Sequence, residues 1–167
     1  LEILTAKQKE LLHEGHDIDF SYVGEESGRF RVNVFRKATG IGAVFRYIPG
    51  DVPTLEQLNM PPVLKNFCDY HQGMVLVTGS TGTGKSTTLA AMIDHLNESR
   101  SLNIISLEDP IEFVHPSKQS QVIQREVGTH VTSCAAGVRS AMREDPDVIL
   151  VGELRDAETI SMAMTAA

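Results

Sequence analysis

The stretch Met74-Val-Leu-Val-Thr-Gly-Ser-Thr-Gly-Thr-Gly-Lys-Ser-Thr-Thr-Leu-Ala-Ala-Met-Ile93 decides the fold. Residues 79–86 match every fixed position of G-x-x-x-x-G-K-[ST], the phosphate-binding P-loop. The apolar run 74–77 predicts a buried strand before this loop, and apolar side chains at helical spacing predict a helix over 85–97. A strand before the loop and a helix after it argue against a chance glycine-rich turn. The stretch therefore predicts a nucleoside triphosphate site.

The groups that would hold the phosphates come mostly from the backbone of the loop. Its glycines let the chain turn tightly and point N–H groups inward, and the start of the following helix adds a partial positive charge. Lys85 is predicted to reach the β- and γ-phosphates, and the Ser86 hydroxyl is predicted to bind Mg2+. The predicted nucleotide-binding residues are Gly79, Ser80, Thr81, Gly82, Thr83, Gly84, Lys85, Ser86 and Thr87.

Composition is that of an ordinary globular protein. The 167 residues, 41% hydrophobic and 22% charged, suit one domain or two small ones. The longest apolar runs, such as 148–151, are far shorter than the roughly 20 residues of a membrane-spanning helix. The two cysteines, Cys68 and Cys134, have no metal-like spacing. We therefore expect neither a disulfide scaffold nor a zinc site, and we predict a reducing cytosol.

The charge balance argues against a nucleic-acid groove. Residues 73–167 carry 7 Lys and Arg against 12 Asp and Glu, a net charge of −5 out of −7 for the whole chain. A nucleic-acid groove needs clustered Lys and Arg. The chain also starts without an initiator Met and stops inside an expected helix that has no capping residue. We therefore expect it to be part of a longer protein.

The N-terminal part predicts a helix followed by a small antiparallel sheet. Residues 5–14 have helical character, and apolar and polar residues alternate over 17–23, 29–36 and 41–48. A turn is expected at 24–28. The polar face of the hairpin carries Arg31 and, on the returning strand, Arg46; such arginines usually belong to a solvated face.

A composition break at 49–53 predicts a linker. The predicted organisation is then a partial N-terminal α+β domain over 1–48, a linker over 49–62 and an incomplete P-loop core over 63–167.

The second half predicts an open α/β sheet. A helix opened by the prolines at 61 and 62 is expected to end at Gly73, and strands are expected at 103–108 and 147–152, with a short polar strand within 119–127. Helices are expected from residue 132 or 133 to about 144 and from Asp156 onward. Strands that alternate with helices indicate a mostly parallel, doubly wound sheet, which binds ligands at the carboxyl ends of its strands.

Two acidic residues follow strands of this predicted sheet. The apolar run 148–151 ends at Glu153 in the manner of a Walker B strand, whose carboxylate would meet the Mg2+ shell. Glu108 ends the neighbouring strand and is predicted to polarise the attacking water. The alternative for Glu108 is a structural role, capping the turn at Asp109 and Pro110.

These phrases together resemble the secretion ATPase superfamily and, within it, the PilT-like motors that retract type IV pili. The resemblance covers nearly the whole chain. It rests on the family's Walker A motif, matched at 79–86, its Asp box, matched at 105–115, and its Walker B motif, matched at 140–156. Residues 28–35 and 45–49 resemble two strands of its N-terminal domain. The fold that it implies is a RecA-like P-loop NTPase core, truncated at its C-terminal end and preceded by part of a small PAS-like α+β domain. The family's His box would follow Ala167.

The resemblance also implies a function. It implies a Mg2+-dependent ATPase that forms a homohexameric ring, retracts type IV pili in twitching motility, and lies in the cytoplasm at the inner-membrane face of a bacterial envelope machine. Its partners would be further copies of itself, the inner-membrane pilus platform and sister pilus ATPases. Arg31 and Arg46 would reach the phosphates, reversing their assignment to a solvated face. Glu108 and Glu153 would be the catalytic acids.

Three alternatives stay open at this point. An assembly or secretion ATPase of type II or type IV secretion would share all these phrases. A nucleotide-gated regulatory subunit would bind ATP without fast turnover, but the presence of both Glu108 and Glu153 argues against it. A nucleic-acid translocase shares the core architecture, but the acidic balance and the lack of a basic, aromatic stripe place it last.

Overall fold

The computed structural model describes residues 2–24, 27–48 and 50–167, and the chain divides into two compact units, Leu1–Gly50 and Asp51–Ala167. Each unit is described by itself. Two residues of the expected turn at 24–28, and Pro49 at the start of the expected linker, lie outside the described residues. The division into 1–48, 49–62 and 63–167 stays a prediction.

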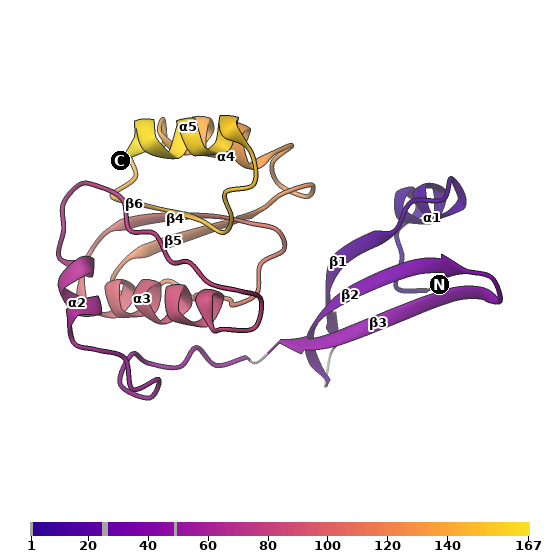
Figure 1. Ribbon diagram of the computed structural model, residues 1–167, viewed down its shortest axis with the longest axis horizontal. Coiled ribbons are helices and arrows are strands. Elements are labelled where there is room, and N and C mark those ends of the chain that lie inside the picture. Colours follow the sequence, from indigo (N-terminus) through magenta and orange to yellow (C-terminus); the bar gives the residue numbers. More distant parts are fainter. Residues whose placement is uncertain (1, 25–26, 49) are drawn as a thin grey trace. The chain divides into compact units, whose positions relative to one another are not determined.

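The first unit is a helix packed on a three-stranded antiparallel sheet. Its elements are α1 (Ala6–His13), β1 (Ile18–Gly24), β2 (Gly28–Lys37) and β3 (Gly40–Ile48), and the strand order is β1-β2-β3 (Figure 1). This confirms the predicted helix and three strands. Thr5 starts α1 because its hydroxyl accepts from the Gln8 N–H while the Gln8 side chain accepts from the Thr5 N–H, which satisfies two free N–H groups of the first turn.

Alternation along the strands separates the two faces of this sheet. Val32 and Val34 point to one face and are buried with Ile18 under Leu4 and Leu12. The residues between them point to the other face, so the period of two that predicted the strands also sets which side chains form the core.

The second unit contains the P-loop and a parallel sheet. Its elements are α2 (Val63–Cys68), α3 (Lys85–Ser99), β4 (Asn103–Glu108), β5 (Gln121–Glu126), α4 (Cys134–Ala141), β6 (Val148–Val151) and α5 (Ala157–Ala166). The strand order is β5-β4-β6, and both pairs are parallel. Helix α3 lies on one side of this sheet, and α4 and α5 lie on the other (Figure 1). The doubly wound arrangement is thereby confirmed.

Each face of the sheet has its own apolar core. On the α3 side, Ile104 of β4 packs with Ile93 and Leu96, and Leu55 from the expected linker is buried in the same cluster. On the other side, Leu107 packs with Val138 of α4, and neither side chain is exposed. Two packed faces make β4 the most buried strand of the unit, with its last residue, Glu108, at the edge of the core.

The strand predicted at 74–77 is wrong: this segment forms no regular secondary structure and has no strand partner within the described residues. Met74, Val75 and Leu76 are 40%, 41% and 63% exposed. Together with β6 the segment lines a cavity of about 910 Å³. An apolar run becomes a strand only when its N–H and C=O groups meet a neighbouring strand, and local sequence cannot supply that neighbour.

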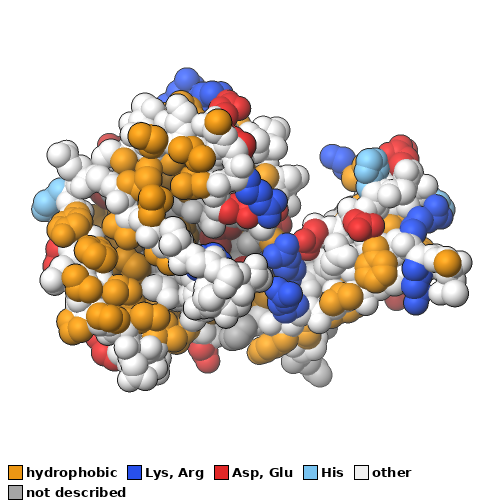
Figure 2. Space-filling view, viewed as in Figure 1, with side chains coloured by type: hydrophobic (Ala, Val, Ile, Leu, Met, Phe, Trp, Pro, Cys, Tyr) orange, Lys and Arg blue, Asp and Glu red, His pale blue; other side chains and the backbone are white. Residues whose placement is uncertain are grey.

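The second unit also has exposed apolar side chains outside this segment. Figure 2 shows hydrophobic side chains gathered over one face of the second unit, and the exposed residues of this unit include Val63, Tyr70, Leu76 and Met164. Within the described ranges, the helices are all too short or too polar to cross a bilayer.

Candidate functional site

The P-loop turns into α3 through glycines whose conformations other residues rarely adopt. Gly79, Gly82 and Gly84 have φ of 151°, 82° and 92°, and α3 begins directly afterwards at Lys85. At Gly79 a side chain would also collide, since a Cβ there would lie 2.8 Å from the Thr83 hydroxyl oxygen. The glycine spacing of the motif is therefore a requirement of this backbone path.

Side chains of the loop close it on itself. The Lys85 ammonium donates to the Ser80 carbonyl oxygen (2.9 Å), and the Thr83 hydroxyl donates to the same oxygen (2.8 Å). Lys85 is therefore folded back over the loop that precedes it. Ser86 is exposed and lies with Thr87 in the first turn of α3, where unpaired N–H groups favour an anion.

The predicted acids of the two strand ends come together. Leu107 pairs with Val151, and the Gly152 N–H donates to the Leu107 carbonyl (2.8 Å), so β4 and β6 end at the same level. Their acids line one cavity of about 200 Å³. Its walls are Leu107, Glu108, Asp109, Val127, Thr132, Ser133, Cys134, Glu153, Arg155 and Asp156.

Glu108 is the more enclosed of the two acids. Its Oε1 accepts from the Ser106 hydroxyl (2.6 Å) and from the Gln124 side-chain amide (3.0 Å). Burial raises the pKa of Glu108, while these two hydrogen bonds and the backbone of Glu112 lower it and the Glu112 charge raises it. A half-buried carboxylate with a raised pKa beside a cavity is the arrangement expected of a proton acceptor.

Glu153 is more open and connects two cavities. One oxygen lies 2.6 Å from the Arg155 Nε, and the side chain is 37% exposed. Besides the smaller cavity it lines the larger one, which Gly79 and Lys85 also line. The structure therefore brings the end of the Walker B strand and the P-loop lysine to the same cavity.

The candidate metal ligands are few. Among the residues that the structure describes, no group of three or more His, Cys, Asp or Glu side chains could hold a metal ion. Mg2+ beside a nucleotide usually takes only one or two protein oxygens and completes its shell with phosphate and water. The Ser86 hydroxyl and the Glu153 carboxylate are oxygens of this kind, so the residues present fit Mg2+ bound together with a nucleotide.

The predicted arginines stand on one face of the sheet in the first unit. Arg31 and Arg46 are direct partners in the β2–β3 register, so their side chains project from the same face. The Arg31 guanidinium forms a fork with the Asp19 carboxylate, with an Nη2 to Oδ2 distance of 2.6 Å, while Arg46 is exposed. Two like charges side by side repel one another, and Asp19 offsets part of that repulsion.

The sequence interpretation missed the groups that hold Glu108. Ser106 is a polar residue inside the apolar stretch 104–107 of β4, which is its only local signal, whereas Gln124 lies in the mostly polar strand β5 and carries none. Arg155 and Asp156 of the smaller cavity were likewise not identified as site residues. Gln124 reaches Glu108 because β5 pairs with β4, and Arg155 and Asp156 reach the cavity because β6 pairs with β4, so both depend on strands that lie far apart in the sequence.

Comparison with known proteins gives consistent matches. The family model described as "Type II/IV secretion system protein" matches residues 14–167. The type IV pilus retractation ATPase PilT of Pseudomonas aeruginosa is 52% identical over 166 residues, which are 99% of this chain and 48% of that protein. The twitching motility protein of Neisseria gonorrhoeae is 50% identical over 165 residues, which are 99% of this chain and 44% of that protein.

A solved structure supports the same grouping. The crystal structure of the pilus retraction motor PilT with bound ADP superposes with a TM-score of 0.96 at 45% identity, over 99% of this chain and 48% of that one. This match confirms the predicted fold class, a RecA-like P-loop core preceded by part of a small α+β domain. The chain spans about half the length of the relatives that it matches.

Proposed function

The chain belongs to the family of type II/IV secretion system proteins, and from that premise we propose that the whole protein is a Mg2+-dependent ATPase that drives retraction of type IV pili. The observation that carries the proposal is the position of Glu153. It lines one cavity with Lys85 of the P-loop and a second cavity with Glu108. The groups that we propose to bind phosphate, to hold a metal ion and to accept a proton thus line two cavities that have Glu153 in common.

Each group has a distinct part in the proposed reaction. The P-loop N–H groups and the Lys85 ammonium bind the phosphates, and Ser86 and Glu153 hold Mg2+, which when bound neutralises charge on the phosphate oxygens. Glu108 takes the proton of the attacking water. Burial suits this part because it raises the pKa of the carboxylate toward the working pH. A general base is most effective there, since it is still ionised but also has a high affinity for a proton.

The arginine pair has a part in the same proposal. We assign Arg31 and Arg46 to contacts with the nucleotide phosphates, because a guanidinium presents a fixed and permanently charged fork to phosphate oxygens. Two adjacent guanidiniums on one face suit a ligand with several negative charges, and the cost of placing them together is offset when that ligand binds.

The relatives also support a proposal for the partners and the location of the whole protein. We propose a homohexameric ring that contacts the inner-membrane pilus platform and sister pilus ATPases, and a location in the cytoplasm at the inner-membrane face. Retraction is preferred over assembly or secretion because two relatives at 50% and 52% identity are named for twitching motility and pilus retraction.

The test is Glu108→Gln in the full-length protein, with Glu158→Gln as the matched control. Glu158 is an exposed acid of α5 in the same unit that pairs with Arg139. We expect Glu108→Gln to retain ATP affinity, measured by fluorescent-nucleotide titration, and to lose about 100-fold or more in turnover, since a general base contributes 10²–10⁴-fold. Glu158→Gln should hydrolyse ATP at the wild-type rate. Wild-type turnover in Glu108→Gln would refute the proposed role of Glu108.

A further inference from the structure

The side chain of Gln124 lies beside Ser106 and Glu108 on one face of the parallel sheet. In the register of β4 and β5, Gln124 is the partner of Ser106, and Glu108 follows Ser106 by two residues. A period of two places all three side chains on the same face. Both neighbours then donate to one oxygen of Glu108, its Oε1, at 2.6 Å from the Ser106 hydroxyl and 3.0 Å from the Gln124 amide.

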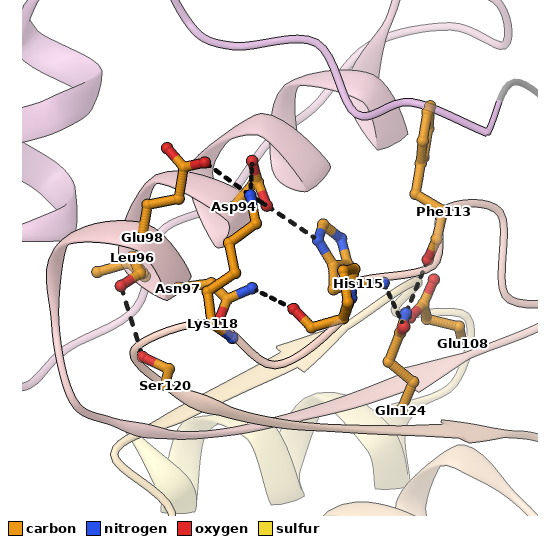
Figure 3. Close-up of polar contacts among 11 residues, drawn as sticks. Asp94, Leu96, Asn97, Glu98, Glu108, Phe113, His115, Lys118, Ser120 and Gln124 are labelled. Carbon is orange, nitrogen blue, oxygen red and sulfur yellow. Dashed lines mark hydrogen bonds and ion pairs between the residues drawn. The ribbon is translucent and has the colours of Figure 1, made fainter.

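Both the nitrogen and the oxygen of the Gln124 side-chain amide form hydrogen bonds. Its Nε2 donates to Glu108 Oε1 and to the carbonyl oxygen of Phe113 (2.8 Å), and its Oε1 accepts from the backbone N–H of His115 (2.8 Å) (Figure 3). The reversed amide would set its oxygen against two other oxygens and its nitrogen against an N–H. Only one orientation satisfies all three bonds, so the hydrogen-bond network fixes the side chain.

The loop that Gln124 holds is itself attached to α3. Asn97, which is 0% exposed, donates from its side chain to the carbonyl of Pro116 (2.8 Å) and accepts from the N–H of Lys118 (2.9 Å). The Lys118 ammonium binds both oxygens of Asp94 (2.9 and 3.0 Å) (Figure 3). Gln124 is therefore bonded to a segment that is tied to the helix starting at the P-loop, rather than to a free loop.

We propose that Gln124 is a positioning residue for Glu108: it holds the carboxylate by Oε1 against the loop carrying Phe113 and His115, so that the other oxygen accepts the proton of the attacking water. This inference rests on the proposed role of Glu108. A base whose orientation is fixed before reaction needs no reorganisation at the moment of proton transfer, and a displacement of about 1 Å costs on the order of 10²-fold in rate. Ser106 supports the same oxygen from the strand of Glu108 itself.

The test is Gln124→Met, which keeps the length of the side chain and removes its polar groups. Gln121→Met is the matched control, because Gln121 lies on the same strand and is exposed. In the full-length protein we expect Gln124→Met to lower kcat by about 10-fold or more with little change in ATP affinity, as is usual when a supporting partner of a site residue is lost. Gln121→Met should keep the wild-type kcat.

A double-mutant cycle separates positioning from general loss of structure. If Gln124 acts through Glu108, Gln124→Met should not reduce further the residual single-turnover rate of Glu108→Gln, whereas a structural effect would lower both backgrounds by the same factor. Ser106→Ala removes the other donor without touching the loop, so it serves as the test if Gln124→Met folds poorly. It too should lower kcat in the wild-type background and have no further effect in Glu108→Gln.

The outcomes distinguish this inference from the proposed function. Wild-type kcat in both Gln124→Met and Ser106→Ala, or equal loss in both backgrounds of the cycle, would overturn the positioning role while leaving an inactive Glu108→Gln in place. Full activity of Glu108→Gln would instead remove the proposed function on which the inference rests.

Discussion

The packing of α4 on β4 predicts that Gly137→Ala destabilises the wild-type protein but stabilises a Leu107→Ala variant. Helix α4 crosses β4 at Gly137, and a Cβ at this position would lie 2.6 Å from Leu107 Cδ2, 3.3 Å from Cδ1 and 3.5 Å from Cγ. Carbon atoms prefer about 3.5–4.0 Å. Leu107 is 0% exposed and packs with Val131 and Val138, so a shift of its side chain would disturb these packed neighbours. Gly137→Ala must therefore overpack this face of the sheet.

The expected magnitude is the difference between two opposing effects. Overpacking costs about 1–3 kcal/mol, whereas Ala in place of Gly inside a helix gains roughly 1 kcal/mol. At the middle of the range, Gly137→Ala should lower the free energy of unfolding by about 1 kcal/mol, or the melting temperature by about 2–4 °C in a chain of 150–250 residues.

The same change should stabilise the Leu107→Ala variant. That variant lacks Cγ and both Cδ atoms, which are the atoms nearest the new methyl group, so only the helical gain of roughly 1 kcal/mol remains. The methyl group also fills part of the cavity. Urea denaturation of the four proteins of this cycle, each in the full-length chain, measures the coupling, which we expect to be about 2 kcal/mol. If Gly137→Ala changes the free energy of unfolding equally in both backgrounds, the close contact with Leu107 is not the reason that this position requires glycine.

Three further predictions concern the residues around the site. Lys118→Met leaves the Asp94 carboxylate, which is 7% exposed, without its ammonium partner, and should lower the free energy of unfolding in urea by about 1–3 kcal/mol; an unchanged midpoint would contradict this. Burial lowers the pKa of His115 below its usual 6.5, while the Asp94 charge raises it and the Lys118 charge lowers it. Stability should therefore be complete above pH 6.5 and fall as the pH drops through the lowered pKa, and a denaturation series should show a smaller fall for His115→Leu. At Gly152 a Cβ would lie 3.2 Å from the Leu107 carbonyl oxygen, a tight contact directly before Glu108. Gly152→Ala should therefore shift the end of β4 and lower kcat by about 10-fold while melting changes little, and equal losses of both would point to misfolding.

Much of the fold could be predicted because its signals are local. The capping pair of Thr5 and Gln8, the alternation over β1 to β3 and the caps of Ser133 and Asp156 each depend on residues within a few positions of one another. The ends of β4 and β6 were predicted for the same reason, since an apolar run and its terminal acid are contiguous. The prediction of a strand at 74–77 was wrong because it rested only on an apolar run, and a strand also needs a neighbouring strand with which to pair.

The site divides in the same way. The P-loop glycines and Lys85 lie within a few residues of one another, and the conformation of that short segment fixes their arrangement. The sequence motif was therefore enough to predict the loop. The environment of Glu108 was not contained in any motif, because Gln124 lies 16 residues further along the chain and belongs to another strand. Whether Arg31 and Arg46 contact phosphate stays a prediction.

The sequence by itself determined that a glycine-rich loop leads into a helix, that two strands end in acids and that the strands are parallel. Those properties follow from φ preferences, periodicity and capping, which act between near neighbours. Tertiary structure alone decided that one oxygen of Glu108 is held by Ser106 and Gln124, and that the run before the P-loop lies without a strand partner within the described residues. The physical reason is that parallel strands pair across long connections, and no local pattern encodes which polar side chains that pairing brings to one carboxylate.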